Sequence, residues 1–158
     1  MLKLFESCFF ASYKSNEDGI SNAAIEAVFP EDVSFSDEKK EEIFKLLSHN
    51  IDLNDKNRSI FAFNIDTTYY FALAFFENER NNEIVIESNF PFAYMYFSFL
   101  REAEQMFQRD SFNDPNLRFT FITSLLQSWE NKYSPSIEVN FPTGITQVVL
   151  NNDHFTFL

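Results

Sequence analysis

The sequence predicts an α/β domain in which a five-stranded sheet is sandwiched by one helix on one face and two helices on the other. Strand-length and helix-length apolar patterns follow one another in the order two strands, one helix, three strands, two helices. Both faces of the run at 68–76 are apolar, so helices must cover the sheet on both sides. A chain of 158 residues with 45% hydrophobic content suits one such domain.

The chain begins with a predicted hairpin. Leu4–Tyr13 is short, apolar and aromatic, which is typical of a strand. The polar stretch Lys14–Gly19 reads as a turn, and a second strand follows at Ala24–Phe29. Pro30 ends the second strand because proline cannot continue the backbone ladder.

A helix is predicted next. Ser34 or Ser36 can cap its amino end, and the helix runs to about Asn50. Asp37 and Glu38 fall in its first turn, where carboxylates favour the positive end of the helix dipole. Its apolar positions share one side at helical spacing: Ile43, Phe44, Leu46 and Leu47.

Three further strands complete the predicted sheet. Arg58–Ile65 and Thr68–Phe76 are aromatic runs joined by a turn at Asp66-Thr67, and a fifth strand follows at Glu83–Glu87. Alternation along Thr68–Phe76 places apolar side chains on both faces. We therefore expect these strands to be buried on both sides.

Two helices follow the strands. Ser88 and Pro91 indicate the start of a long helix, and Asp110–Pro115 breaks it before a third helix that begins near Asn116. The first buries Phe92, Met95, Tyr96, Phe99, Ala103, Met106 and Phe107. The second buries Phe119, Ile122, Leu125, Leu126 and Trp129.

Residues 1–132 thus form the predicted domain, and residues 133–158 form an extended tail or a connector. Pro135 and the turn Pro142-Thr-Gly144 punctuate this tail, and Ile145–Leu150 is an extended run typical of a small hairpin or a linking segment.

Composition excludes several classes of function. The net charge of -12 repels nucleic acid and anionic lipid surfaces. Cys8 has no partner for an internal disulfide, and with His49 and His154 far apart no zinc set can be assembled, so we expect no metal. Gly19 and Gly144 are the only glycines, which excludes a glycine-rich phosphate loop, and we expect no cofactor.

Neither a catalytic set nor a membrane segment is evident. Cys8 is predicted to be a buried structural thiol without a basic neighbour, and neither histidine has a carboxylate at a diagnostic spacing. No apolar run reaches the length of a membrane-spanning helix. Glu6 interrupts the apolar amino terminus, which favours a strand over a signal sequence, and we expect a cytoplasmic protein.

Acidic residues concentrate in one part of the chain. Between Glu17 and Glu42, nine carboxylates outnumber two lysines. One interpretation is a surface that keeps the protein in solution, and the other is a docking face for a basic protein partner. The candidate partner-binding residues are Glu31, Asp32, Asp37 and Glu38.

The predicted order of elements resembles the longin fold, and in particular its upstream form in DENN-domain proteins. Three stretches carry the resemblance: Ile25–Pro30 with the acidic residues after it, Ser59–Leu73, and Ile84–Leu100. The last is similar to the family's strand, then serine, then aromatic-proline start of a long helix. Phe121–Leu126 resembles the next helix, so the resemblance covers roughly residues 4 to 130.

The resemblance implies a protein-interaction module that contributes to Rab GTPase binding and guanine nucleotide exchange in membrane traffic. The partner would be a Rab-type small GTPase or another longin or trafficking protein, with location at membranes only through partners. In that family a larger downstream module shares the Rab surface. The resemblance carries over no individual contact residue.

Two alternatives stay open at this point. A longin-type adaptor or assembly module would bind partners without exchange activity. A small carrier of apolar ligands would instead need a cavity within the Phe-rich interior. Enzymatic activity stays undecided, because at most the chain is part of an exchange factor.

Overall fold

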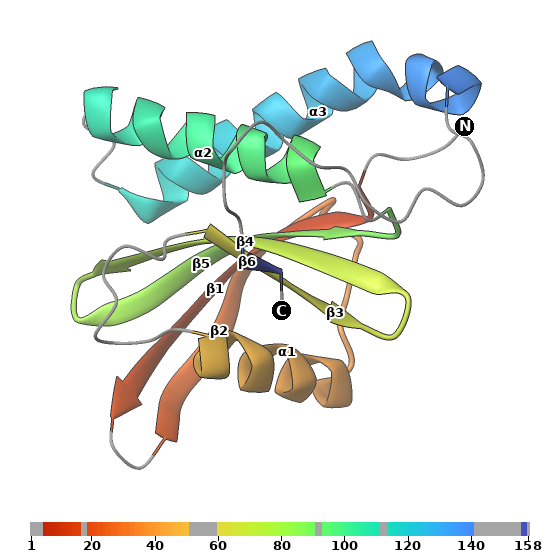
Figure 1. Cartoon of the computed structure of the whole chain (residues 1–158). Helices are drawn as coiled ribbons and strands as arrows, with labels where there is room; N and C mark the ends of the chain where they lie inside the picture. Colours follow the sequence, from red (N-terminus) through yellow and green to blue (C-terminus); the bar gives the residue numbers. More distant parts are fainter. Residues whose placement is uncertain are drawn as a thin grey trace.

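The computed structural model describes residues 5–16, 19–50, 60–90, 93–110, 114–140 and 156–157. These residues form one sheet with helices on both of its faces (Figure 1). The strands are β1 (Ser7–Asn16), β2 (Gly19–Phe29), β3 (Ile60–Ile65), β4 (Thr68–Glu77), β5 (Arg80–Ser88) and β6 (Thr156–Phe157). The helices are α1 (Asp37–Asn50), α2 (Ala93–Asp110) and α3 (Pro115–Asn140).

The sheet has the strand order β2-β1-β5-β4-β3-β6. The hairpins β1–β2 and β3–β4 lie on opposite sides of β5, which pairs antiparallel with both β1 and β4. The two residues of β6 extend the far edge in parallel with β3, through the pairs Phe61 with Thr156 and Ala62 with Phe157. The predicted five-stranded sheet is therefore confirmed, and β6 adds a short sixth strand.

Helix α1 covers one face of this sheet, and α2 and α3 cover the other (Figure 1). The period of two along β5 explains how both faces become apolar. Ile84 and Ile86 belong to the core beneath α2 and α3, whereas Val85 belongs to the core beneath α1. The predicted α/β architecture, longin-like with one helix on one face and two on the other, is confirmed.

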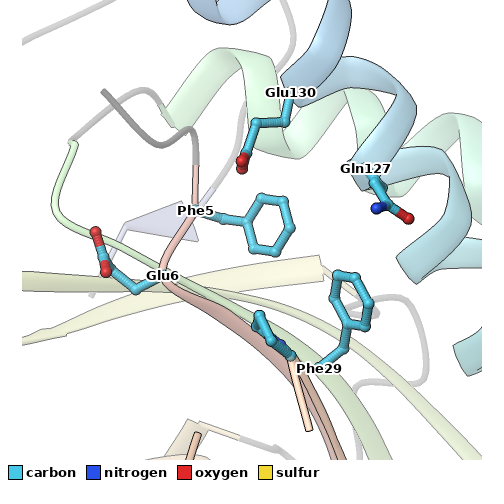
Figure 2. A pocket seen from close by; sticks show the side chains of 6 residues that line it. Phe5, Glu6, Phe29, Gln127 and Glu130 are labelled. Carbon is cyan, nitrogen blue, oxygen red and sulfur yellow. The ribbon is translucent and has the colours of Figure 1, made fainter. Parts of the chain in front are cut away.

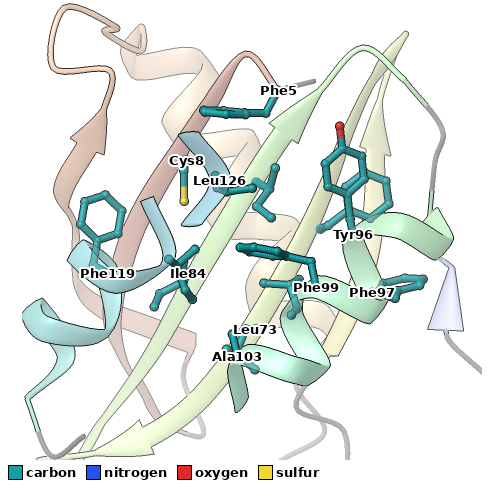
Figure 3. Packing of buried hydrophobic residues seen from close by; sticks show 14 of the residues in the cluster. Phe5, Cys8, Leu73, Ile84, Tyr96, Phe97, Phe99, Ala103, Phe119 and Leu126 are labelled. Carbon is teal, nitrogen blue, oxygen red and sulfur yellow. The ribbon is translucent and has the colours of Figure 1, made fainter. Parts of the chain in front are cut away.

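The core beneath α2 and α3 is built largely from aromatic rings (Figure 3). Phe71 of β4 stacks on Tyr96 with 4.5 Å between ring centroids, and it meets Phe97 in a T-shaped arrangement with 5.7 Å between ring centroids. These contacts fix α2 over the middle of the sheet. The predicted apolar stripes are buried at Tyr96, Phe99, Ala103, Phe107, Phe119, Ile122 and Leu126.

Helix α1 begins as its sequence predicts. The backbone N–H of Lys39 donates to Ser36 Oγ at 3.1 Å, so Ser36, and not Ser34, is the capping residue. Ile43, Phe44 and Leu47 of the predicted stripe are buried against the sheet. The helix ends at Asn50, as expected.

The first hairpin is longer than predicted and irregular. Strand β1 continues to Asn16 and β2 begins at Gly19, so much of the expected turn is strand. The pairing between the two strands shifts register at two points, between Phe10 and Ala11 and between Ser12 and Lys14. An extra unpaired residue at such a shift, as in a β-bulge, bends the strand and increases its local twist.

The carboxyl-terminal part also differs from the prediction. Helix α3 continues to Asn140, although the tail was expected to begin at residue 133. Pro135 led to that expectation, but a proline removes one intrahelical hydrogen bond and a helix can run through it. The predicted turn and extended run at 142–150 and His154 lie outside the described residues, as do the side chains of His49 and Trp129.

Candidate partner-binding site

The four predicted partner-binding carboxylates all lie on the connection between β2 and α1. Glu31 and Asp32 occupy the turn that follows β2, and Asp37 and Glu38 form the first turn of α1. All four side chains are exposed. Asp37 and Glu38 have a structural role as well, because carboxylates stabilise the amino end of a helix. Glu31 and Asp32 have no such role.

This connection is held at several points. The backbone N–H of Val33 donates to the carbonyl of Pro30 at 3.1 Å and closes the turn. Phe35 is buried, and its ring meets the edge of Phe9 with 5.2 Å between centroids. Lys39 Nζ lies 4.9 Å from the centre of the Phe35 ring. The acidic side chains therefore project from a fixed loop.

A pocket of about 150 Å³ opens beside the start of this loop, where β1 begins, β2 ends and α3 passes (Figure 2). Its aromatic wall consists of Phe5 and Phe29, whose rings stack with 6.2 Å between centroids. Glu130 extends from α3 toward Phe5. The remaining lining residues are Glu6, Pro30 and Gln127.

The charge around the pocket is negative. Glu6 and Glu130 line it, and no lysine or arginine of the described chain does. The Glu6 carboxylate accepts a hydrogen bond from Asn89 Nδ2 at 3.1 Å and lies away from the aromatic wall, so Glu130 is the carboxylate above the rings (Figure 2). Pro30 at the rim leads directly into Glu31, which extends the acidic surface.

Two further glutamates are buried beneath α1 rather than exposed. Glu83 is fully buried, and the Tyr13 hydroxyl donates to its Oε1 at 2.9 Å. The same hydroxyl lies 3.5 Å from the carbonyl oxygen of Leu47 in α1. Oε2 of Glu83 has no hydrogen-bond partner among the residues that the structure describes. Burial raises the pKa of Glu83 from its ordinary 4.5 to about 8.

Glu87 lies four residues further along β5, on the same face of the strand as Glu83. Lys39 Nζ of α1 lies 2.9 Å from its Oε2, so the first turn of α1 is tied to the sheet by an ion pair. Tyr70 is a second neighbour, and its pKa is raised by burial and then by the Glu87 charge and hydrogen bond. Lys39 is partly exposed, which places this pair at the margin of the core.

These buried groups do not form a catalytic site. A carboxyl whose pKa is about 8 has the proton affinity of a general acid, but Glu83 is 0% exposed and no substrate can reach it. Cys8 is likewise fully buried, as predicted, and burial raises the pKa of its thiol. Both groups contribute to the core.

Other kinds of site are not evident within the described part of the chain. No group of three His, Cys, Asp or Glu side chains there is placed to hold a metal ion. None of the helices described combines the length and hydropathy needed to cross a bilayer. The pocket of about 150 Å³ is smaller than the roughly 300 to 1,000 Å³ of typical small-molecule sites.

Comparison with known proteins identifies no family for this chain. No family model matches the sequence, and no curated protein matches it. The fold and the site therefore rest on the geometry described above.

The exposed acids were predictable from the sequence, whereas the pocket was not. Its walls come from the residues just before β1, the end of β2 and the middle of α3, which no local pattern links. The buried glutamates do have a signal in the sequence. Glu83 and Glu87 alternate with Val85 along one face of β5, and that face had to lie beneath a helix.

Proposed function

We propose that this chain is a protein-interaction module of a DENN-type regulator of membrane traffic, and that its partner is a Rab-type small GTPase. The observation that carries the proposal is the longin-like sheet, with strand order β2-β1-β5-β4-β3, one helix on one face and two on the other. This is the architecture expected from the resemblance in Ile25–Pro30, Ser59–Leu73 and Ile84–Leu100.

The chemistry of the described residues supports a binding role. Glu83, whose pKa is strongly raised, is fully buried beneath α1. The carboxylates on the loop between β2 and α1 are exposed, namely Glu31, Asp32, Asp37 and Glu38. A surface of this kind attracts and orients a basic partner through complementary charge. It does not transform a substrate.

Contribution to nucleotide exchange requires no acid, base or nucleophile. A protein that binds the nucleotide-free GTPase more tightly than the loaded one shifts the GTPase toward nucleotide release, by as much as the two affinities differ. The proposed role is therefore to bind the nucleotide-free GTPase with higher affinity than the nucleotide-loaded one. In the family that the chain resembles, a downstream module shares this task.

The test is a binding assay with purified Rab GTPases in the nucleotide-free, GDP-loaded and GTP-loaded states. The expected result is capture of at least one Rab with preference for its nucleotide-free state. Capture should weaken as the salt concentration rises, because exposed charges are screened. Binding of a trafficking protein regardless of nucleotide would overturn the exchange role and identify a longin adaptor or assembly module. Failure to bind any Rab in any state would overturn the Rab assignment.

Two charge variants locate the contact. The first neutralises the loop with Glu31→Gln, Asp32→Asn, Asp37→Asn and Glu38→Gln. The matched control removes four exposed acids elsewhere with Glu26→Gln, Asp66→Asn, Glu79→Gln and Glu102→Gln. If the loop docks the partner, the first variant weakens capture about tenfold or more and flattens its salt dependence, whereas the control does not. Equal capture by both would leave the loop as a solvating surface.

A further inference from the structure

We propose that the outer edge of β3 binds an extended, largely apolar segment of a partner protein as an added parallel strand. This edge is the side of Ile60–Ile65 that faces away from β4. The two residues of β6 pair there in the chain alone, so the partner's strand takes the place of β6 (Figure 1). The edge lies at the other end of the strand order from β2, where the acidic loop begins, and the contact goes beyond the proposed recognition of a GTPase.

Strand β6 demonstrates that this edge accepts a parallel strand. Its two residues pair only with Phe61 and Ala62. Within the described chain, the remainder of the edge at 63–65 has no strand beside it. A partner segment as long as β3, which has six residues, therefore forms more backbone hydrogen bonds than β6 does. Main-chain bonds of this kind supply the affinity when a strand is added to a sheet.

Strand β3 has the properties of a strand that pairs readily. Its six pairs with β4, from Ile60 with Leu73 to Ile65 with Thr68, run without a shift of register. None of its six side chains carries a charge. Natural sheets protect their edges with charges, bends and short strands, and β3 itself has only the short β6 as protection.

The edge at the other end of the sheet lacks these properties. Strand β2 pairs with β1 through two register shifts, and it carries the exposed Glu26 and a positive φ of 52° at Asn22. A strand that bends and carries a charge is a poor template for further pairing. Of the two, the edge of β3 is therefore the one suited to a partner.

The faces beside this edge define the side chains that the partner brings. Paired residues on neighbouring strands point to the same face of a sheet. Residues opposite Phe61, Phe63 and Ile65 therefore extend the core beneath α1, where apolar side chains are favoured. The residue opposite Asn64 can be polar, because Asn64 is exposed. The partner is thus an extended segment with apolar side chains at every second position.

The test uses two synthetic peptides, titrated into the ¹⁵N-labelled full chain and followed by NMR. The short peptide copies residues 152–158 and reproduces the pairs of β6. The long peptide adds Thr-Val at its carboxyl end, which in the same register places residues opposite Asn64 and Ile65. We expect the long peptide to shift the backbone amides of β3 saturably and to bind about tenfold more tightly than the short one. Equal affinities, or no saturable shifts in β3, would overturn the proposal.

A third peptide shows whether the backbone makes the contact. It is the long peptide with proline at the two positions that pair with Phe61 and Ala62, so it stays apolar but lacks the N–H groups there. We expect it to leave the β3 amides unchanged. Binding as tight as that of the unaltered long peptide would show that apolar attraction, and not strand addition, explains the shifts.

A matched pair of variants tests whether β6 and the partner share the edge. Thr156→Pro with Phe157→Pro removes the N–H groups of β6, and the long peptide should then bind about tenfold more tightly than to the unaltered protein. Thr156→Val with Phe157→Leu keeps these groups and should leave the affinity unchanged. Equal affinity for both variants would contradict a shared edge. Because no GTPase is present, failure of peptide binding leaves the proposed function intact, and failure of Rab capture leaves the strand-addition site intact.

Discussion

The two faces of the sheet differ in the charge that they bury. Beneath α2 and α3 the described core is mainly apolar and aromatic, as in the stack of Phe71 on Tyr96, and its polar contacts include the Ser88–Tyr96 hydrogen bond at 2.9 Å and the Arg118–Glu77 ion pair, which ties α3 to β4. Beneath α1 the core also contains two carboxylates, Glu83 and Glu87, with the tyrosines Tyr13 and Tyr70 beside them. The same strand, β5, supplies side chains to both faces.

The difference follows from the number of helices on each face. A single helix of 14 residues brings few apolar side chains, and α1 is rich in charged residues. It is tied to the sheet at both ends by polar contacts, through Lys39 and Glu87 near its start and through the Leu47 carbonyl and Tyr13 near its end. Apolar packing is non-directional, whereas these contacts fix one position of the helix along the strands.

The largest expected effect is on the apolar face. Phe71→Ala removes a fully buried ring that contacts both Tyr96 and Phe97, and it should lower the free energy of unfolding by about 3 to 5 kcal/mol. Phe76→Ala on the same strand is the control, because Phe76 is 67% exposed and its loss should cost no more than about 0.5 kcal/mol. Urea unfolding measures both. Similar losses in the two variants would show that the aromatic stack is not what holds this face.

An intermediate effect is expected beneath α1, and it depends on pH. Because the pKa of Glu83 is raised from 4.5 to about 8, the folded protein holds a proton that the unfolded chain releases between these two pH values. The free energy of unfolding therefore falls as the pH rises through this window, by up to about 1.4 kcal/mol per pH unit from this group alone. Above pH 8 the fall levels off.

Glu83→Gln isolates that contribution. The glutamine oxygen still accepts the Tyr13 hydrogen bond, and the side chain carries no charge at any pH. Unfolding curves at pH 5, 6, 7, 8 and 9 should show the variant gaining stability relative to the original protein as the pH rises. Parallel curves for the two proteins would contradict the raised pKa and the polar character of this face.

The smallest expected effect is at the start of α1. Ser36→Ala removes the hydroxyl that accepts the Lys39 N–H, and it should cost about 1 kcal/mol. Ser34→Ala is the matched control, since Ser34 is exposed and lies two residues before the cap. Hydrogen exchange should be faster in the first turn of α1 in Ser36→Ala and unchanged in α2. Faster exchange throughout α2 as well would show that the two faces do not loosen separately.

Local patterns were sufficient to predict the layers of the fold. The apolar stripe of α1 and the serine before it depend on neighbours in the sequence, and so do the aromatic runs of β3 and β4. The lengths of β1 and β2 were not predictable in the same way, because their polar ends are stabilised by pairing across the hairpin. Arg80 adds to this by donating from Nε to Ser12 Oγ at 2.6 Å, a contact between residues distant in the sequence.

The candidate site likewise has a part that depends on sequence neighbours and a part that depends on residues distant in the sequence. The exposed acids at 31–38 were predictable because they lie within one segment and carry a charge signal of their own. The aromatic pocket was not, because Phe5, Phe29 and Glu130 look individually like a core ring, a strand end and a surface helix residue. Only the assembled sheet and α3 bring them together.

The bulges in the first hairpin affect how the molecule behaves at high concentration. Where the register shifts between Phe10 and Ala11, the extra residue on β2 is Glu26, and its carboxylate is exposed. Further along, Asn22 adopts a positive φ of 52° and turns the backbone again. A strand that is bent twice and carries a charge makes a poor template for fibril growth, because stacked chains need a straight and uniform ladder. The hairpin thus gives β2 protection against amyloid-like assembly.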